Sequence, residues 1–445
     1  MKAVIMAGGM GTRIASVRSD VPKPMIEIAG KPILQYQIEN LRADGITDIT
    51  LVVGHLGSVI TDYFGDGAAF GVSISYFVEE TPLGTAGSLF KMLPEAQGNG
   101  PHLDGDFLLL CGDVIFSIDF KRFIAFHKER KAWASLMAHP NGHPFDSSLL
   151  VTETLPPAEK GGLPVETGRV TAWLTKEDER VFYKNRVNAG IQIISVELLR
   201  ETMRHYVPRH PENPDNIDLD RDVLKPAIKS GKIFAYDTSE YIKDMGTPDR
   251  FHETELDIAS GRVQARNLGR KQKAIFLDRD GTINKANGFI TAPGQFELVP
   301  GAAEAIKKIN KSEYLAVVVT NQPVIARGDA TFEELRLIHD KMETELGKEG
   351  AFIDALYFCP HHTDKGFPGE RAEYKCNCLC RKPNPGMFFD AAQALNIDLS
   401  QSYMIGDGKN DILAGKNAGV KECFLVSEHC SLKDAVEKIV SPSIQ

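Results

Sequence analysis

The stretch Ala274-Ile-Phe-Leu-Asp-Arg-Asp-Gly-Thr-Ile283 decides the fold and the chemistry of the second half of this 445-residue chain. Its apolar beginning predicts a buried strand, which two carboxylates, Asp278 and Asp280, follow with one residue between them. The turn at Gly281 lets the chain leave the strand, so both carboxylates can reach one cation and one phosphate. Mg²⁺ favours oxygen ligands, while one carboxylate can attack phosphorus and the other can protonate the leaving oxygen. The stretch indicates a phosphoryl-transfer site, although an isolated Asp-x-Asp is more often a pair of solvated surface acids.

Three later segments favour the phosphoryl-transfer interpretation. A second apolar strand ends in Thr320, and Asn321 and Gln322 follow it, which places donors where a phosphate could be held. Lys382 follows in an Arg-Lys-Pro run, and a third strand runs into Asp407 and a further carboxylate shortly after it. Each of these residues alone would be an ordinary strand-end or surface residue. In this order, at the carboxyl ends of predicted parallel strands, they describe a ligand site at the edge of a doubly wound sheet.

With these motifs, residues 273 to about 428 resemble the haloacid dehalogenase (HAD) superfamily of phosphatases, and within it the branch of heptose 1,7-bisphosphate and histidinol phosphatases. The resemblance implies a HAD-like α/β domain that hydrolyses phosphate monoesters with Mg²⁺. It assigns the nucleophile to Asp278, the general acid and base to Asp280, phosphate binding to Thr320 and Lys382, and substrate contacts to Arg327 and Arg381. It also assigns the Mg²⁺ ligands to Asp278, the Asp280 carbonyl and Asp407.

Cysteine and histidine residues gather between the second and third of these segments, in Cys359-Pro-His361-His362 and in Cys376-Asn-Cys378-Leu-Cys380. A Cys-x-His pair with a later Cys-x-Cys pair provides four ligands, which suits a closed tetrahedral zinc site that pins a loop. A disulfide framework is disfavoured because the seven cysteines are an odd number and no signal peptide precedes the first strand. Free or redox-active thiols remain the alternative. The phosphatase resemblance selects Cys359, His361, Cys378 and Cys380 as the Zn²⁺ ligands, with Cys376 as a competing ligand and His362 as a bystander.

The first half of the chain opens on a different phosphate motif. An apolar strand, residues 1–7, enters the run Gly8-Gly-Met-Gly-Thr-Arg13, whose glycines let backbone amides approach phosphate oxygens while the arginine adds a charged fork. The run has neither the Rossmann Gly-x-Gly-x-x-Gly spacing nor the Walker Gly-Lys-Ser/Thr ending. Lys23 follows between two prolines that restrict the backbone on both sides, so it can face a triphosphate. The alternative is a lysine in a plain proline turn.

Residues 1 to about 252 resemble the sugar nucleotidyltransferases in this Gly-Gly-x-Gly-Thr-Arg signature and its later Pro-Lys-Pro. The resemblance implies a Rossmann-like domain that joins a sugar 1-phosphate to a nucleoside monophosphate and releases pyrophosphate without a covalent intermediate. It assigns triphosphate binding to Gly8, Gly9, Gly11, Thr12, Arg13 and Lys23, a nucleobase loop to Glu80, Gly84 and Thr85, and Mg²⁺ binding to Asp113 and Asp244. Lys176 and Asn188 fall where the family contacts the sugar phosphate. Catalysis of such a step is mainly positioning and charge neutralisation, the roles expected of Arg13 and Lys23.

The substrates follow from the two resemblances taken together. Residues 16–20 are most similar to the heptose 1-phosphate guanylyltransferases, with mannose 1-phosphate guanylyltransferases as the near alternative. A phosphatase and a nucleotidyltransferase on one chain suggest consecutive steps: loss of the 7-phosphate from D-glycero-D-manno-heptose 1,7-bisphosphate, then transfer of GMP from GTP. The product would be GDP-heptose for lipopolysaccharide, another surface polysaccharide or glycoprotein. The alternatives are another sugar-1-phosphate nucleotidyltransferase, a histidinol-phosphatase-like second domain, or one half that serves only as a regulatory binding module.

Length and hydrophobic patterning predict two α/β domains. We expect a nucleotidyltransferase domain over residues 1–257, a polar and basic linker over 258–272, and a phosphatase domain with a zinc loop over 273–445. Both halves alternate strands with amphipathic helices, which predicts parallel sheets in both. The helical faces are expected at Ile33, Leu34, Ile38 and Leu41 in the first half and at Ala302, Ile306 and Ile309 in the second.

Charge and composition narrow the partners. A net charge of −9 and a pI near 5.8 disfavour nucleic acid or an anionic membrane as the main partner, so the expected partners are sugar phosphates and GTP. The sequence contains no recognisable targeting or membrane segment, and its cysteines fit a reducing compartment, which predicts a cytoplasmic protein. The pattern leaves the oligomeric state open.

Overall fold

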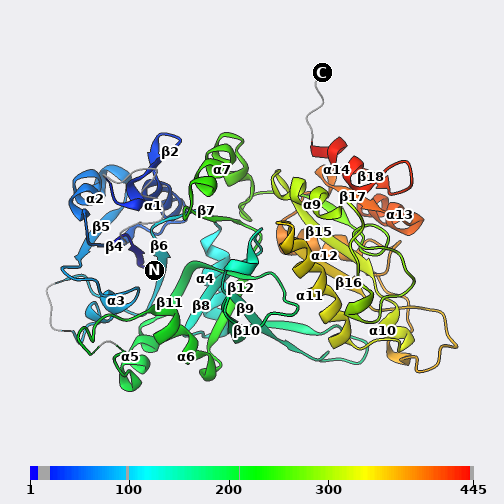
Figure 1. Ribbon diagram of the computed structural model, residues 1–445, viewed down its shortest axis with the longest axis horizontal. Helices are drawn as coiled ribbons and strands as arrows, with labels where there is room; N and C mark the ends of the chain where they lie inside the picture. Colours follow the sequence, from blue (N-terminus) through cyan, green and yellow to red (C-terminus); the bar gives the residue numbers. More distant parts are fainter. Residues whose placement is uncertain (9–20, 97–99, 210, 441–445) are drawn as a thin grey trace. The chain divides into compact units, whose positions relative to one another are not determined.

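The chain folds into two compact units, neither of which is continuous in sequence (Figure 1). The computed structural model describes residues 1–8, 21–96, 100–209 and 211–440. The first unit contains Met1–Ala138, Gly168–Trp173 and Asn188–Asn267. The second unit contains Leu268–Gln445 together with two segments from the first half, His139–Thr167 and Leu174–Val187. We call these two segments the arm.

A nine-stranded sheet lies in the first half of the chain. Its strands, in spatial order, are β5 (Ser73–Val78), β4 (Asp48–Val53), β1 (Ala3–Met6), β6 (Asp106–Cys111), β11 (Val187–Ser195), β8 (Ala134–His139), β12 (Ile233–Asp237), β10 (Val165–Leu174) and β9 (Leu149–Leu155). Strands β5, β4, β1 and β6 run parallel, but β11 is antiparallel to β6 and β10 is antiparallel to β12. The expectation of an all-parallel sheet is therefore wrong here. Runs of apolar residues reveal a buried strand but not its direction, which the connections set.

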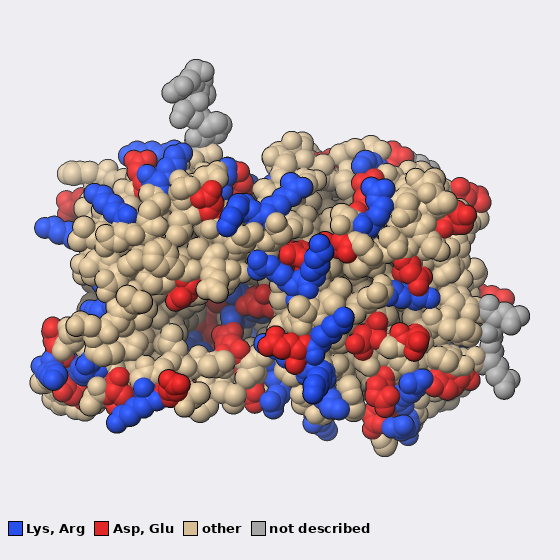
Figure 2. Space-filling model, turned by 180° about the vertical axis from the view of Figure 1, so that it is seen from behind, with Lys and Arg blue, Asp and Glu red and all other residues tan. Residues whose placement is uncertain are grey.

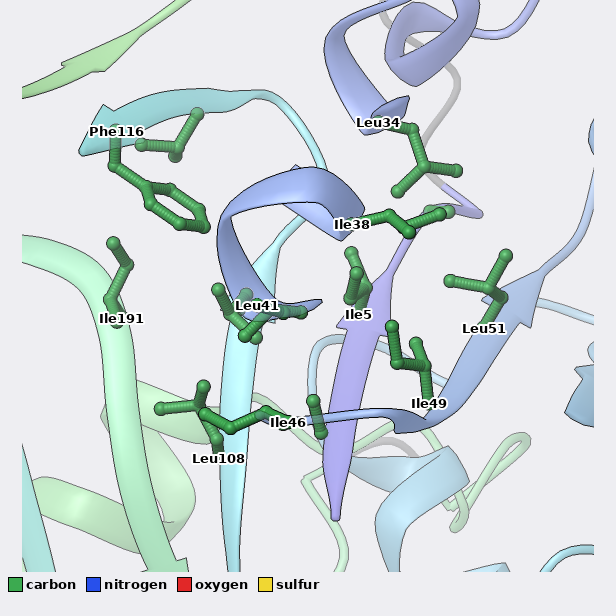
Figure 3. Packing of buried hydrophobic residues seen from close by; sticks show 14 of the residues in the cluster. Ile5, Leu34, Ile38, Leu41, Ile46, Ile49, Leu51, Leu108, Phe116 and Ile191 are labelled. Atoms are coloured by element: carbon green, nitrogen blue, oxygen red, sulfur yellow. The ribbon is translucent and has the colours of Figure 1, made fainter. Parts of the chain in front are cut away.

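Helix α1 (Ile33–Ala43) shows how the first sheet is covered. Leu34, Ile38 and Leu41 recur at helical spacing and are fully buried against residues of β1, β4 and β6 (Figure 3). Ile33 is also buried but packs in a neighbouring cluster with Ile28 and other residues. The remaining helices of the first unit are α2 (Gly57–Phe64), α3 (Gly87–Lys91), α4 (Phe120–Arg130), α5 (Val196–His205), α6 (Lys225–Ala227), α7 (Pro248–Ala259) and α8 (Arg262–Ala265).

Two small antiparallel pairs complete the first half. One joins β2 (Glu27–Ile28) to β3 (Lys31–Pro32), just after the short helix η2 (Lys23–Met25). The other joins β7 (Val114–Ser117) to β13 (Tyr241–Asp244), with Asp244 opposite Val114. This second pair brings together two segments that are far apart in the sequence.

The second unit contains a parallel five-stranded sheet, as expected. Its order is β16 (Ala355–Cys359), β15 (Tyr314–Asn321), β14 (Lys273–Leu277), β17 (Tyr403–Gly406) and β18 (Glu422–Leu425). In β14, Ile275 and Leu277 belong to one hydrophobic cluster, whereas Ala274 and Phe276 belong to another. Because side chains alternate along a strand, these clusters mark the two covered faces of the sheet.

Helices cover both faces of this parallel sheet. They are α9 (Ala302–Asn310), α10 (Val324–Arg327), α11 (Phe332–Lys348), α12 (Gly386–Leu395), α13 (Lys409–Ala418) and α14 (Leu432–Val440). The predicted apolar face of α9 is confirmed, since Ala302, Ile306 and Ile309 are fully buried in the cluster that contains Ile275. The carboxyl ends of β14, β15 and β17 carry the motif residues and define where the site lies.

The expected linker, residues 258–272, is partly helical, because it contains the end of α7 and all of α8. The division between the two units follows Asn267, within this segment. Among the described residues, no helix has the length and apolar character needed to cross a membrane. On the face drawn in Figure 2, basic and acidic side chains are interspersed, which matches the modest net negative charge.

Candidate active sites and metal centre

Asp278 and Lys382 form a buried ion pair at the end of β14. The Lys382 ammonium lies 2.7 Å from Asp278 Oδ1 and 2.6 Å from Asp411 Oδ1, and it also donates to the Val319 carbonyl at 2.8 Å. Burial raises the pKa of Asp278 to about 6, although Lys382 opposes this shift. Burial would lower the pKa of Lys382, but Asp278 and Asp411 together raise it. The lysine is therefore a fixed cation beside the predicted nucleophile.

A cluster of three carboxylates, from Asp278, Asp407 and Asp411, provides oxygen atoms that all lie within 4.8 Å of one another. Burial and the nearby Asp411 carboxylate raise the pKa of Asp407. Gly281 lets the Asp407 carboxylate lie close to the backbone of the turn, because a Cβ at position 281 would lie 2.0 Å from Asp407 Oδ2. The φ of Gly281, +84°, also favours glycine. Hard oxygen donors at this spacing fit a Mg²⁺ ion, which would offset the mutual repulsion of the carboxylates.

The Asp280 carboxylate is held by three neighbours. Arg279 donates to both of its oxygens at 2.8 Å, Gln322 donates to Oδ2 at 2.9 Å, and Asn284 donates to Oδ1 at 3.0 Å. Arg279 is fully buried, so this charge is desolvated and directed at the carboxylate. The Asp280 side chain is only partly exposed and has a fixed orientation, which a group that gives and takes a proton requires.

The predicted phosphate-binding residues lie around this pair. Thr320 is buried at the end of β15 and its hydroxyl accepts a hydrogen bond from Gln322 at 2.9 Å. Asn321 exchanges two hydrogen bonds with the Lys382 backbone, at 3.0 and 3.1 Å, and so fixes the segment that carries the lysine. The sequence motifs of this site are thus brought together by three strand ends and one loop.

The two predicted substrate arginines are held by other groups. Arg327 forms an ion pair with Asp329 at 2.6 Å, and its guanidinium lies 4.5 Å and 4.0 Å from the ring centres of Phe289 and Phe367. Arg381 donates to the His361 carbonyl at 2.9 Å. Their contact with substrate stays a prediction.

Cys359, His361, Cys378 and Cys380 converge into one group, as the phosphatase resemblance selects. The sulfur atoms lie 3.1 to 3.5 Å apart, and His361 Nδ1 lies 3.4 Å from Cys380 Sγ and 3.6 Å from Cys359 Sγ. A hydrogen bond from the Cys359 thiol contributes most to lowering the pKa of Cys380 to about 4. Three sulfurs and one imidazole nitrogen are the donor set of a structural zinc site. Cys376 and His362 lie outside the group of four.

In the first unit, Lys23 and Asp113 form a short ion pair, and Asp244 lies on the adjoining strand. The Met245 amide donates to the Asp113 carbonyl at 2.8 Å, so the backbone joins the two predicted metal aspartates. Asp244 is engaged by Arg250, which donates to its two oxygens at 2.7 and 2.8 Å. Two carboxylates and one lysine at strand ends can hold a cation beside a phosphate chain.

The predicted nucleobase loop is fixed by a segment that the sequence motifs did not indicate. The Leu219 amide donates to Thr85 Oγ1 at 2.7 Å, and the Ala86 amide donates to the Ile217 carbonyl at 2.9 Å. Gly84 has a φ of +76°, and a Cβ there would lie 2.4 Å from the Ile217 carbonyl oxygen. Glu80 in the same loop is exposed. The backbone conformation of this loop therefore depends on its contacts with Ile217 and Leu219, which its own sequence does not predict.

The other residues predicted for the transferase site do not all lie in the described part of the first unit. Gly8 follows β1 and lies close to Gly54, since a Cβ at position 8 would lie 3.2 Å from the Gly54 nitrogen. Asn188 lies on β11, and its buried side-chain oxygen has no hydrogen-bond partner among the residues that the structure describes. Gly9, Gly11, Thr12 and Arg13 lie outside the described residues. Lys176 belongs to the second unit, where it is exposed and 3.9 Å from Glu177, so its role at the sugar phosphate stays a prediction.

Sequence reasoning assigned no specific role to two residues of the phosphatase site, Asp411 and Arg279. Asp411 stands near Asp407 in the same motif and was expected only as a further carboxylate, whereas it pairs with Lys382. Arg279 lies between the two motif aspartates, where an arginine would be taken for a surface residue, and Gln322 links it to Thr320. Gln322, which directly follows β15, was expected as a donor to phosphate, whereas it donates to Asp280 and accepts from Arg279.

These sites define an α/β protein that pairs a HAD-type phosphoryl-transfer centre with a second phosphate-handling site. The nucleotidyl transferase family model matches residues 2–261 and the HAD-hydrolase-like model matches residues 379–443. The first match covers more than half of the chain, so the chain belongs to the nucleotidyl transferase family. It carries a nucleotidyltransferase domain and a HAD phosphatase domain.

A relative of known activity matches the second half. The D-glycero-beta-D-manno-heptose-1,7-bisphosphate 7-phosphatase of Pasteurella multocida is 43% identical over 155 residues, which are 35% of this chain and 82% of the relative. The second half therefore belongs to the family of that phosphatase.

Two solved structures resemble separate parts of the chain. The D,D-heptose 1,7-bisphosphate phosphatase from B. bronchiseptica, complexed with magnesium and phosphate, is 31% identical, with a TM-score of 0.33 over 38% of this chain and 98% of that one. HddC from Yersinia pseudotuberculosis, complexed with GMP-PN, is 23% identical, with a TM-score of 0.43 over 58% of this chain and 99% of that one.

Proposed function

We propose that the chain is a bifunctional enzyme of GDP-heptose formation. Its phosphatase domain removes the 7-phosphate from D-glycero-D-manno-heptose 1,7-bisphosphate, and its transferase domain joins the remaining 1-phosphate to GMP from GTP. The observation that carries the proposal is the arrangement of Asp278, Lys382 and the oriented Asp280 in a domain related to a heptose bisphosphate phosphatase.

The proposed phosphatase step uses three side chains. An Asp278 carboxylate oxygen forms a bond to phosphorus while the bond from phosphorus to the sugar oxygen breaks, and Asp280 gives that oxygen a proton. Asp280 then accepts a proton from the water that hydrolyses the aspartyl phosphate, which restores both residues. The Lys382 ammonium offsets negative charge beside the nucleophile throughout.

Metals complete the proposed site without changing these roles. Mg²⁺ would be held by Asp278, the Asp280 carbonyl and Asp407, with Asp411 in the same carboxylate cluster, and would supply charge neutralisation for the phosphate. We assign a structural Zn²⁺ to Cys359, His361, Cys378 and Cys380. Arg381 and Lys382 directly follow Cys380, so a fixed Cys/His loop also fixes the lysine.

The transferase step requires positioning more than covalent chemistry. An oxygen of the sugar 1-phosphate attacks the α-phosphorus of GTP and pyrophosphate leaves with its electron pair. Lys23 supplies a cation at the triphosphate, and Asp113 and Asp244 are the proposed carboxylates for Mg²⁺. The choice of GTP rests on sequence similarity to heptose 1-phosphate guanylyltransferases. The choice of heptose is supported by the phosphatase on the same chain, whose product would be the required 1-phosphate.

Other substrates define the alternatives that an assay must separate. Use of mannose 1-phosphate would indicate a guanylyltransferase whose phosphatase domain acts on an unrelated substrate. Use of histidinol phosphate would indicate a phosphatase domain of the histidinol phosphatase branch. A purely regulatory half is disfavoured by the intact acids and lysines of both sites. The proposed compartment is the cytoplasm, where the free cysteines at described positions would remain reduced.

A panel assay tests the proposal directly. Purified protein is incubated with heptose 1,7-bisphosphate, heptose 1-phosphate, mannose 1-phosphate or histidinol phosphate, together with GTP, ATP, CTP, UTP or dTTP, while phosphate and pyrophosphate are measured separately. We expect phosphate release from the heptose bisphosphate alone and pyrophosphate release with heptose 1-phosphate and GTP. Equal use of mannose 1-phosphate, or a preference for CTP, UTP or dTTP, would contradict the substrate assignment but not the nucleotidyltransferase class.

A further inference from the structure

The tip of the arm contacts the Cys/His loop within the second unit. The arm, residues 139–167 and 174–187, lies inside the region that matches the nucleotidyl transferase family, yet it belongs to the compact unit of the phosphatase. Its tip is Gly161-Gly162, between β9 and β10. The loop that it meets carries the predicted zinc ligands and the short helix η8 (Ala372–Tyr374).

The contact involves the one imidazole of the Cys/His group. His361 turns Nδ1 toward the sulfurs of Cys359 and Cys380, and its Nε2 lies 3.2 Å from the Gly161 carbonyl oxygen. A carbonyl can only accept, so the hydrogen of the neutral ring must be on Nε2. This leaves the Nδ1 lone pair directed at the sulfurs, which is the tautomer that binds a metal there.

One further hydrogen bond holds the tip in place, from a tyrosine that packs against His361. The Tyr374 hydroxyl donates to the Gly162 carbonyl at 3.2 Å, and the Tyr374 ring lies 5.9 Å from the His361 ring. Gly161 has a φ of +83°, and a Cβ there would lie 2.6 Å from the Glu373 carbonyl oxygen. Glycine is thus required at position 161 both by its backbone conformation and by the closeness of η8.

The other end of the arm is attached to α11 through buried polar groups. Arg186 and Glu343 form an ion pair at 3.1 Å, with side chains that are 7% and 5% exposed. The Asn185 amide also donates to Glu343 at 2.9 Å, and the Tyr183 amide donates to Thr344 Oγ1 at 2.9 Å. Because breaking a buried pair leaves an uncompensated charge, this attachment fixes the base of the arm to the phosphatase fold.

We propose that the arm is a positioning element for the Cys/His metal centre: the Gly161 carbonyl orients His361, so a segment of the transferase sequence contributes to metal binding in the phosphatase. The inference rests on the zinc assignment but on neither catalytic activity. It predicts that arm and metal stabilise each other, since a contact present only in the ordered state links the two.

Metal affinity tests the first half of this link. Zinc binding is measured by competition with a chromophoric chelator for the whole protein and for two variants, Gly161→Ala and Tyr374→Phe. We expect about a tenfold loss of affinity for Gly161→Ala and a smaller loss for Tyr374→Phe. Gly301→Ala is the matched control, because Gly301 also has a positive φ, +80°, but a Cβ there would meet no atom within 4 Å.

Hydrogen exchange tests the second half. After zinc is removed by a chelator, amide exchange in residues 157–165 should rise, while exchange in α5 of the first unit stays unchanged. Unchanged affinity in both variants, an equal loss in Gly301→Ala, or exchange that rises equally in both segments would overturn the proposal. Absence of any bound zinc in the wild-type protein would overturn it as well. None of these readouts depends on the substrate, so a wrong substrate assignment would leave them intact.

Discussion

The phosphatase and transferase sites differ in how their charges are held. Lys382 and Asp411 have side chains that are 2% and 5% exposed. Lys23 and Asp113 are 11% and 33% exposed, and Asp244 is 42% exposed. Charges paired away from water are fixed before substrate arrives, whereas exposed carboxylates gain their full effect when a cation and a phosphate chain cover them. The phosphatase needs a directed nucleophile, and the transferase needs a place where two substrates meet.

The largest effect is expected from removing the buried carboxylate that we propose as the nucleophile. Asp278→Asn should lower phosphate release by at least about a thousandfold, because an amide cannot form the aspartyl phosphate. Pyrophosphate release should stay near the wild-type rate, as measured in separate assays on one preparation. Asp62→Asn, at an exposed position of α2, is the control for the substitution itself. Substantial phosphate release by Asp278→Asn would show that another group attacks phosphorus.

A smaller effect is expected at the more exposed site. Asp113→Asn should lower pyrophosphate release on the order of a hundredfold and raise the Mg²⁺ concentration needed for half-maximal rate, because an amide is a poorer ligand for a hard cation. Phosphate release is the internal control. If the rate fell without a change in Mg²⁺ dependence, Asp113 would act through its ion pair with Lys23 rather than through the metal.

A third substitution, in the Cys/His loop, tests whether this loop holds Lys382 in its buried position. Cys378→Ser should reduce bound zinc from about one per chain and lower phosphate release about tenfold, because Lys382 follows the loop directly. Cys376→Ser is a matched control, since Cys376 is exposed and outside the group of four. Elemental analysis and phosphate release are measured on the same samples. Full zinc content in Cys378→Ser would exclude this residue as a ligand.

The same contrast explains what the sequence could predict. Motif order was sufficient to predict that Asp278, Thr320 and Asp407 lie close together, because residues at the ends of parallel strands meet at one edge of a sheet. The grouping of Cys359, His361, Cys378 and Cys380 was predicted from the phosphatase resemblance. It was insufficient for Arg279, whose burial depends on Gln322 and Asp280 around it. Local patterns also could not show that strand β11 runs antiparallel to β6.

Long-range packing accounts for the rest. Lys176 is the one residue of the arm that the sequence analysis singled out, and it does not predict where the arm lies. The place of the arm in the second unit depends on contacts such as Arg186 with Glu343, which lie far apart in the sequence. The loop with Gly84 is similarly shaped by residue 217, which no motif singled out. Spacing rules describe neighbours along a strand or helix, and they carry no information about which distant segment completes a site.

The smallest effect concerns Asp340, a buried acid whose negative charge is less well offset by neighbouring cations than the charges of the catalytic site. Asp340 lies on α11 with its side chain 9% exposed, and burial raises its pKa to about 7. Arg336 on the same helix and Lys184 of the arm oppose this shift, whereas Glu343 and Glu166 add to it. The folded protein therefore holds a proton on Asp340 at pH values where the unfolded chain, with an ordinary carboxyl pKa near 4, does not.

This difference fixes the sign of the pH dependence. The contribution of Asp340 to stability is fully present below about pH 4 and is lost as the pH rises through about 7, because only the folded state binds the proton in between. Asp340→Asn resembles the protonated acid at every pH, so its thermal unfolding midpoint relative to the wild type should rise between pH 5 and pH 8. We expect a relative gain of about 1–2 kcal/mol at pH 8. Glu349→Gln, at the exposed end of α11, should follow the wild type at every pH. A constant difference between Asp340→Asn and the wild type would mean that Arg336 and Lys184 keep Asp340 ionised, and that its burial is as well compensated as that of Asp411.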